Sequence, residues 1–241
     1  MAAIFYPLLV LVEFWLFFRL WKLRRKSEKR NVGVLILQVV LFSLMYDGLV
    51  LSLGRLIGEG ILLAQLNVGR YLFYAIFSPL LMVTGMEFAA RADVRWAQMR
   101  VFRLIIWIAV ISLIGFGTVL QWQFRESLMA DSSMGILRYV HETGFLPFAP
   151  LLTTLVLMIL GMLIWRHIKW PWVFLGALVM FIASAVPLGL VGPVVNSGAQ
   201  VLLLGALVAT ERRLLTPDYS LSASELDSRI SQVMAGRSNK K

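Results

Sequence analysis

Residues 34–53 read VLILQVVLFSLMYDGLVLSL, and Asp47 is the one charged residue in this stretch. An α-helix needs about 20 mainly apolar residues to cross the hydrocarbon core of a bilayer. The stretch therefore predicts a membrane-spanning helix. A charged group at that depth costs about 2.5–3.5 kcal/mol on insertion scales, so Asp47 needs a structural or functional reason to be there.

Similar apolar runs recur along the whole chain. Of the 241 residues, 59% are hydrophobic and only 15% are charged, whereas soluble domains carry roughly 25% charged residues. This composition excludes a water-soluble globular protein. Seven runs have spanning length, at about residues 2–20, 34–53, 71–90, 101–120, 146–165, 171–189 and 194–209. The sequence predicts an all-α integral membrane protein, with a seven-transmembrane-helix bundle over residues 1–215.

The basic residues predict how this bundle is oriented. Seven spans divide the loops between two faces, and nearly all of the 23 lysines and arginines fall on one of them. The exceptions are Arg55, Arg70, Arg125 and Arg138. Because cytoplasmic loops carry the excess of Lys and Arg, we expect the N-terminus outside and the C-terminus in the cytoplasm. The plasma membrane is the expected location.

Segments outside the spans indicate what the protein contacts. The basic run at residues 22–30 predicts binding to anionic membrane lipids, and we expect no nucleic-acid partner. In the cytoplasmic tail, residues 216–241, Ser222 and Glu225 have the spacing of a helix-capping box. Apolar residues follow at helical spacing, which predicts an amphipathic helix that lies on the inner leaflet or binds a protein partner. A short interfacial helix is expected around residues 134–140 of the external loop.

Two further acidic residues fall inside the predicted spans. Glu13 lies near the middle of the first span, and Arg19 is too far along that helix to pair with it. Glu13 is therefore either a protonated or hydrogen-bonded group that faces another helix, or a proton or cation site. Glu87 has Arg91 four residues later, a spacing that predicts a self-contained ion pair at the inner boundary.

Polar residues from several predicted spans share one depth near the outer face. Asp47 shares a helix face with Ser43 and Gly54, so it is expected to face the bundle and to need a partner from another helix. Arg55 and Glu59 are expected to pair with each other. The predicted outer cluster consists of Asp47, Arg55, Glu59, Arg70, Tyr74, Glu142 and Asn196. Such a set suits either an ion-pair lattice that seals the bundle or a ligand pocket in which arginine positions an anion.

Missing residues exclude several kinds of chemistry. The chain has no cysteine, which excludes disulfides and thiolate metal sites. Its two histidines, His141 and His167, fall on opposite faces of the predicted bundle and cannot share a zinc ion. A retinal Schiff base needs a lysine in the last span, and none occurs between Lys169 and Lys240. We expect no metal and no cofactor.

Three functions remain open, and whether the chain is an enzyme is one of the open points. The first is binding or modification of a lipid, an isoprenoid or a small polar ligand at the outer cluster. The second is a structural or assembly subunit whose charges hold helices together. The third is a small transporter with Glu13 and Asp47 on its path, which the almost wholly apolar fourth and sixth spans weaken. An open outer cavity favours the first function, and a closed, mutually paired cluster favours the second.

Overall fold

A computed structural model describes residues 2–26, 31–132, 135–141, 148–185 and 188–215. Glu142 and the predicted tail helix lie outside these ranges. The helices are α1 (Ala2–Lys26), α2 (Val32–Ile57), α3 (Ile61–Phe77), α4 (Leu81–Arg91), α5 (Arg95–Gln98), α6 (Arg100–Gln123), α7 (Phe148–Ile168), α8 (Trp172–Ala185) and α9 (Leu188–Leu214). A 3-10 turn, η1 (Arg125–Ser127), precedes two short strands, β1 (Leu128–Asp131) and β2 (Arg138–His141).

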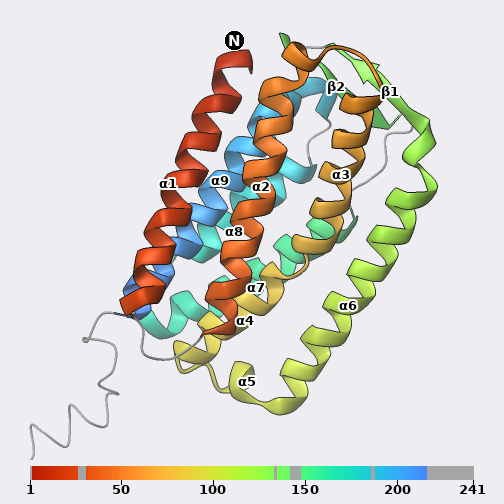
Figure 1. The fold of residues 1–241 in the computed structure, drawn as a ribbon. Coiled ribbons are helices and arrows are strands. Elements are labelled where there is room, and N and C mark those ends of the chain that lie inside the picture. The colour runs from red at the N-terminus through yellow and green to blue at the C-terminus, as the bar shows by residue number, and fades with distance from the viewer. Residues whose placement is uncertain (1, 27–30, 133–134, 142–147, 186–187, 216–241) are drawn as a thin grey trace, which may run out of the picture.

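The long helices stand side by side as a bundle (Figure 1). Six helical stretches are long and apolar enough to cross a membrane, and α3 together with α4 forms one of them. Many large apolar side chains on these helices are exposed, as expected where the surrounding solvent is lipid. The chain is thus a multi-pass helical membrane protein. The sequence predicted seven spans; its sixth corresponds to α8, which is a shorter apolar helix.

Helix α2 lies at the centre of the packing, in contact with α1, α3 and α4. One large apolar core joins its inner and middle turns to α4, α7, α8 and α9, and includes Leu37, Leu41, Phe88, Leu160 and Leu204. Two smaller clusters pack near the outer end, around Tyr6 and around Leu63. The core therefore fills the inner and middle parts of the bundle, and buried polar side chains lie toward both ends.

The third span is interrupted in its middle. Helix α3 ends at Phe77, and α4 begins at Leu81. Pro79 lies between them and has no N–H to donate to the carbonyl of Ala75. This span also begins ten residues earlier than the sequence indicated, because α3 starts at Ile61 rather than at residue 71. Asn67 and Arg70 therefore lie inside the helix and not in a loop before it.

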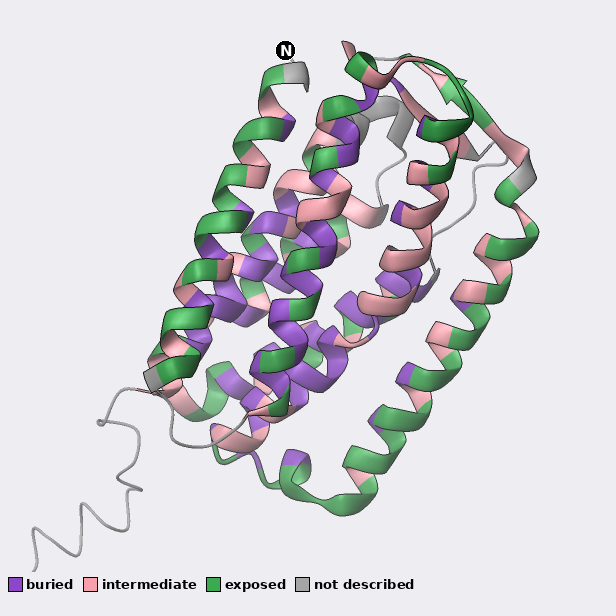
Figure 2. Cartoon of the chain, in the orientation of Figure 1, coloured by how far each residue is buried: buried purple, intermediate pink, exposed green. Residues whose placement is uncertain are grey.

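Helix α6 lies at the edge of the bundle, mainly against α3 (Figure 1). Its buried residues are Ile106, Val110 and Gly117, and most of its remaining surface is exposed (Figure 2). An apolar helix in this position faces lipid along most of its length. Residues of α1, α2, α4, α7, α8 and α9 supply most of the apolar interior.

The external segment after α6 folds as an antiparallel hairpin. Leu128 to Asp131 of β1 pair with Arg138 to His141 of β2, so the expected interfacial helix around residues 134–140 is wrong. The hairpin packs on the outer ends of α2 and α3 through Leu137, which joins Val50 and Leu63. Gly54 allows this approach, since a Cβ at that position would meet the Leu137 carbonyl oxygen. The small residue at Gly54 thus makes room for the hairpin backbone.

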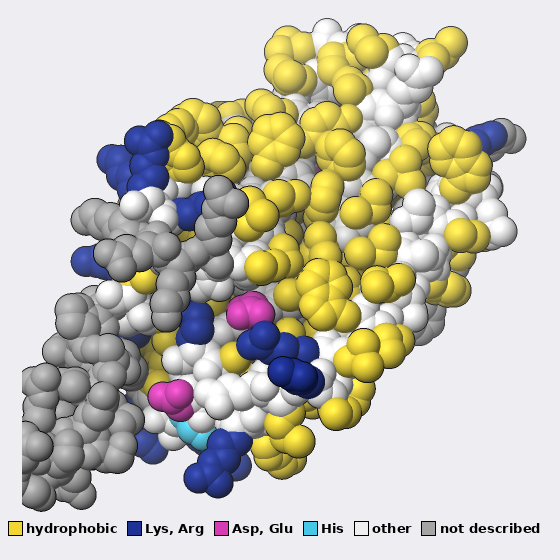
Figure 3. Space-filling model, turned by 60° about the horizontal axis from the view of Figure 1, so that its bottom comes forward, with side chains coloured by type: hydrophobic (Ala, Val, Ile, Leu, Met, Phe, Trp, Pro, Cys, Tyr) yellow, Lys and Arg dark blue, Asp and Glu magenta, His cyan; other side chains and the backbone are white. Residues whose placement is uncertain are grey.

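Basic side chains gather at the end of the bundle opposite the hairpin (Figure 3). This end is formed by the C-terminal ends of α1, α4, α7 and α9 and the N-terminal end of α6. Arg24, Arg91, Arg103, Arg166 and Arg212 are among its basic residues. The sequence placed these residues on one face, and the structure brings them to one end.

The close approach of α7 and α8 depends on Gly161, where an added Cβ would lie 2.5 Å from the backbone nitrogen of Phe174. We expect Gly161→Ala to lower the free energy of unfolding by about 1–3 kcal/mol, because the backbone it meets cannot move aside. The matched control is Gly115→Ala in α6, where nothing lies within 4 Å. Unfolding in detergent micelles measures both, and equal losses would contradict the assignment.

Candidate functional site

The outer cluster is organised by an ion pair between two helices. Arg70 Nε of α3 lies 2.8 Å from Asp47 Oδ1 of α2. The Arg70 side chain is only 8% exposed. Asp47 was expected to face the bundle and to find its partner on another helix, and both expectations are confirmed. A buried pair of this kind offsets the cost of two charges in an apolar medium only when further hydrogen bonds complete it.

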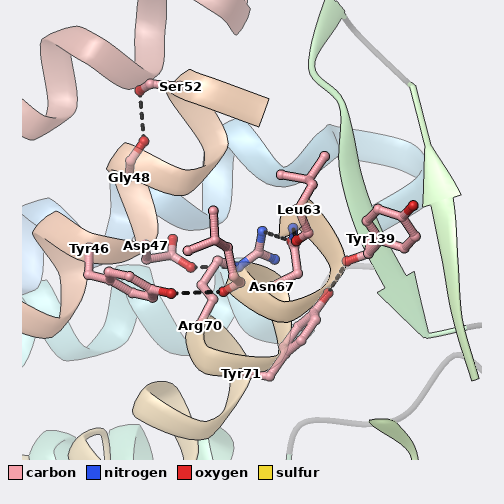
Figure 4. Close-up of polar contacts among 10 residues, drawn as sticks. Tyr46, Asp47, Gly48, Ser52, Leu63, Asn67, Arg70, Tyr71 and Tyr139 are labelled. Atoms are coloured by element: carbon pink, nitrogen blue, oxygen red, sulfur yellow. Dashed lines mark hydrogen bonds and ion pairs between the residues drawn. The ribbon is translucent and has the colours of Figure 1, made fainter. Parts of the chain in front are cut away.

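Those hydrogen bonds are present around Arg70 (Figure 4). Arg70 Nη1 donates to Asn67 Oδ1 at 2.8 Å, and Asn67 Nδ2 donates to the Leu63 carbonyl at 2.8 Å. The guanidinium also lies 4.8 Å from the centre of the Tyr71 ring. Asn67 was not predicted as part of the outer cluster, although its position three residues before Arg70 on a helix indicates that the two side chains can meet. The arginine is thus held from several sides.

Two tyrosines extend this network to neighbouring backbone. The Tyr46 hydroxyl donates to the Leu66 carbonyl at 3.1 Å, which joins α2 to α3. The Tyr71 hydroxyl donates to the Tyr139 carbonyl at 3.0 Å, which joins α3 to strand β2 (Figure 4). Helices α2 and α3 and the hairpin are therefore fixed relative to one another by polar contacts at one depth.

Asp47 keeps part of its surface available despite this network. A quarter of its side chain is exposed, whereas its partner Arg70 is almost fully covered. Below it, a cavity of about 20 Å³ is lined by polar groups from three helices and by apolar side chains. The polar groups are Ser43 of α2, Tyr74 and Ser78 of the α3 span, and Gln200 of α9. Ser43 lies one helical turn below Asp47, so the ion pair and the cavity form one polar region.

Part of the predicted cluster does not join this region. Arg55 and Glu59 are exposed at the outer end. Helix α2 ends at Ile57, and Gly58 takes a positive φ of 78°, so no continuous helix carries the expected i, i+4 pair. Tyr74 lines the cavity and Asn196 is half-buried on α9. Of the predicted cluster, the structure thus brings Asp47 and Arg70 together and leaves Arg55 and Glu59 outside this region.

Glu13 is buried in the interface of α1 with α2. It is 5% exposed, and its Oε2 atom has no hydrogen-bond partner. Gly48 of α2 leaves room for it, because a Cβ there would lie 3.6 Å from Glu13 Oε2. Glu13 lies within electrostatic range of Asp47, which neighbours Gly48. Arg19 instead stacks on the Trp15 ring at 4.8 Å. Glu13 is an acidic group without a cationic partner in the described part of the chain.

The inner end of the bundle has a separate ion pair, which corrects one expectation. Arg91 Nη1 of α4 donates to Glu211 Oε2 of α9 at 2.5 Å, and Glu211 is 1% exposed. Arg91 therefore pairs across the bundle and not with Glu87. Glu87 lies 3.9 Å from Arg103 of α6. Glu211 was not predicted to lie inside the bundle, because the last helix continues to Leu214, beyond the apolar run that ended at residue 209.

Neither metal chemistry nor relationship to known proteins assigns a function to this site. Among the described residues, no group of three or more His, Cys, Asp or Glu side chains could hold a metal ion. Comparison with models of protein families gave no match, and comparison with curated proteins gave none either. The function must be argued from the geometry of the outer polar region.

Removal of the guanidinium should be far more costly than removal of an exposed charge. We expect Arg70→Met to lower the free energy of unfolding by about 3–5 kcal/mol, because it leaves the Asp47 carboxylate without its partner. The exposed Arg55→Met should stay within about 0.5 kcal/mol of the wild type. Chemical unfolding in mixed micelles measures both. If the double variant Asp47→Leu/Arg70→Met recovers none of the loss, the cost does not come from an unpaired carboxylate.

Proposed function

We propose that the chain is a small membrane transporter that admits a small polar solute or ion to the outer half of its bundle. The observation that carries this proposal is Asp47, which is ion-paired inside the bundle yet a quarter exposed. It lies one helical turn above a cavity that Ser43, Tyr74, Ser78 and Gln200 line together with apolar side chains. A group that served only to lock helices would gain nothing from remaining accessible. In membrane proteins, inward-facing ionisable residues commonly mark solute and ion pathways.

The size of the cavity argues against the lipid and isoprenoid alternative. Pockets for drug-sized ligands enclose about 300–1,000 Å³, whereas this cavity measures about 20 Å³. A space of that size accommodates one or two water-sized species. The polar region therefore suits an ion or a very small solute better than a lipid head group.

The position of α6 removes one of the two objections to transport; the other, the apolar sixth span, remains, because α8 packs in the core. The fourth predicted span is almost wholly apolar, which argued against a polar path through the bundle. This span corresponds to α6, and it lies at the edge with most of its surface exposed (Figure 2). A path needs polar residues only on the helices that line the interior. On α2, Asp47 and Ser43 lie one turn apart on the same face.

The proposed topology has seven spans, with α8 as the short sixth and the hairpin on the outer side. Its support is the segregation of charge, because the basic end of the bundle is the end that should face the cytoplasm (Figure 3). Helix α8 contacts both α7 and α9 along the bundle. With 14 residues it reaches about 21 Å. A short buried span between two longer neighbours is compatible with a locally thinned or tilted arrangement.

A structural or assembly role is the second candidate, and the closed network around Arg70 favours it. Every contact from Arg70 to Asp47, Asn67 and Tyr71 serves packing as well as it serves a ligand. The two candidates differ in whether the cavity can be reached from solution.

Cysteine labelling separates these candidates, since the chain has no native cysteine. We expect Gln200→Cys to react with a membrane-impermeant thiol reagent from the outer side of intact cells. A transporter also exposes its site to the other face, so the same variant should react, more slowly, in inside-out vesicles. The control is Leu207→Cys on the same helix, which is fully buried and should react from neither side.

Each labelling pattern has a distinct meaning. Reaction from the outer side alone contradicts transport and leaves an outer binding site. Absence of reaction from both sides contradicts both and favours the structural role. Labelling of Gln200→Cys only in inside-out vesicles would reverse the proposed orientation.

The lipid alternative has its own test. We expect mass spectrometry to find the same co-purified lipids with the wild type and with Asp47→Asn, because the cavity is too small for a head group. The exposed Arg55→Ala variant controls for nonspecific changes in charge at the outer face. Loss of one lipid class from Asp47→Asn alone would contradict this expectation and restore the lipid-binding function.

A further inference from the structure

We propose that the break between α3 and α4 forms a binding site for a monovalent cation of the Na⁺ or K⁺ class. The site lies in the cavity below Asp47, and its ligands are the side-chain oxygen atoms of Ser43, Tyr74, Ser78 and Gln200. This inference deepens the proposed transport function by naming a bound ion, and it can fail while the cavity remains accessible.

The backbone hydrogen bonds at the break differ from those of a continuous α-helix. Leu81 N donates to the Ser78 carbonyl at 3.1 Å, and Met82 N donates to the Pro79 carbonyl at 3.0 Å. Both bonds span three residues instead of four, and Pro79 offers no N–H to Ala75. Irregular backbone at membrane depth is tolerated where it lines a cavity, and broken helices coordinate cations through unwound carbonyls. Phe77 and Ser78, at the start of this break, line the cavity.

The side chains around the cavity converge from three directions. Ser43 comes from α2, Gln200 from α9, and Tyr74 and Ser78 from the interrupted span. The Ser78 hydroxyl oxygen is buried without a hydrogen-bond partner. A buried hydroxyl in this condition costs free energy unless something satisfies it. A cation that accepts its lone pair is one such partner, and a cavity of about 20 Å³ accommodates a dehydrated monovalent ion.

The charges of the outer half favour a cation over an anion. Asp47 and Glu13 supply two acidic groups, and Arg70 is the cation that faces them. Arg138 of the hairpin also lies within electrostatic range, but its guanidinium is paired with Asp131 at 3.0 Å. One acidic group therefore remains to be balanced by a proton or a bound cation. Ligands that are neutral oxygens suit a monovalent ion, since divalent ions are usually held by carboxylates.

The floor of the cavity is apolar and separates it from the inner end. Leu81, Leu203 and Leu204 line its lower part, and Leu203 and Leu204 are fully or almost fully buried. An ion in this conformation therefore exchanges with the outer side. This one-sided access matches a site that is filled before the bundle changes conformation.

The test measures the melting temperature of the full chain in nanodiscs at constant ionic strength. Its arms contain sodium, potassium or N-methylglucamine chloride. We expect sodium or potassium to raise the melting temperature by about 2–4 °C relative to N-methylglucamine, because a ligand that binds only the folded state stabilises it. The difference between the sodium and potassium arms identifies the preferred ion.

Variants of the ligands make the result specific. Gln200→Leu and Ser78→Ala should abolish the ion-dependent shift, and Gln200→Glu should enlarge it by adding a charged ligand of the same shape. Ser52→Ala is the matched control, because its hydroxyl donates to the Gly48 carbonyl outside the cavity. It should keep the wild-type shift. Gln200→Glu keeps the test decisive if Gln200→Leu fails to fold.

Three outcomes would overturn the site. These are equal melting temperatures in all three salts, an unchanged shift in Gln200→Leu and Ser78→Ala, and a shift lost equally in Ser52→Ala. Reactivity of Gln200→Cys from both sides together with equal melting temperatures would remove the cation site and leave the proposed transport function standing. Reactivity from neither side would remove transport itself.

Discussion

The ion pair between Asp47 and Arg70 is the contact on which the outer half of the bundle depends. If one of the two charged side chains moved away, the other would be left without a partner, because lipid surrounds the helices. Both residues are therefore tied to fixed neighbours, Arg70 by Asn67 and Tyr71 and Asp47 by its place on the central helix α2. The hairpin follows from the same contact, since Tyr71 also holds the backbone of β2. One charged pair thus positions two helices and a loop.

A second ion pair, between Arg91 and Glu211, joins α4 to α9 at the inner end of the bundle. Between the two pairs lies the large apolar core, and the broken span passes through the boundary between polar and apolar layers. Proline and irregular backbone would be costly against lipid and are also costly inside a fully apolar core. Their position beside hydroxyl and amide groups costs less free energy if that region contains water or an ion. The irregular backbone between α3 and α4 therefore lies in the same region as polar side chains.

The spans, and the inward direction of Asp47, could be predicted from the sequence, because hydropathy and helical periodicity are local properties. The ion-pair partners that these charged residues find on other helices could not be predicted from the sequence. Arg55 is close to Asp47 in sequence and Arg70 is not, yet Arg55 is exposed near the end of α2, while α3 brings Arg70 to 2.8 Å from Asp47. Glu211 was missed for a related reason. A charged residue after an apolar run looks like the start of a loop, and only its burial against Arg91 shows that the helix continues.

The same charge arrangement sets the selectivity of the outer region. Arg70 is the only cation facing the described interior that an anionic solute could use, apart from Arg138, and both already have carboxylate partners. An anion would have to displace Asp47 from a hydrogen-bonded pair and would then meet Glu13, which has no partner of its own. A cation or a neutral solute meets the exposed part of Asp47 and the hydroxyl groups below it without breaking any bond. In the proposed transporter, this arrangement favours cations and neutral solutes over anions.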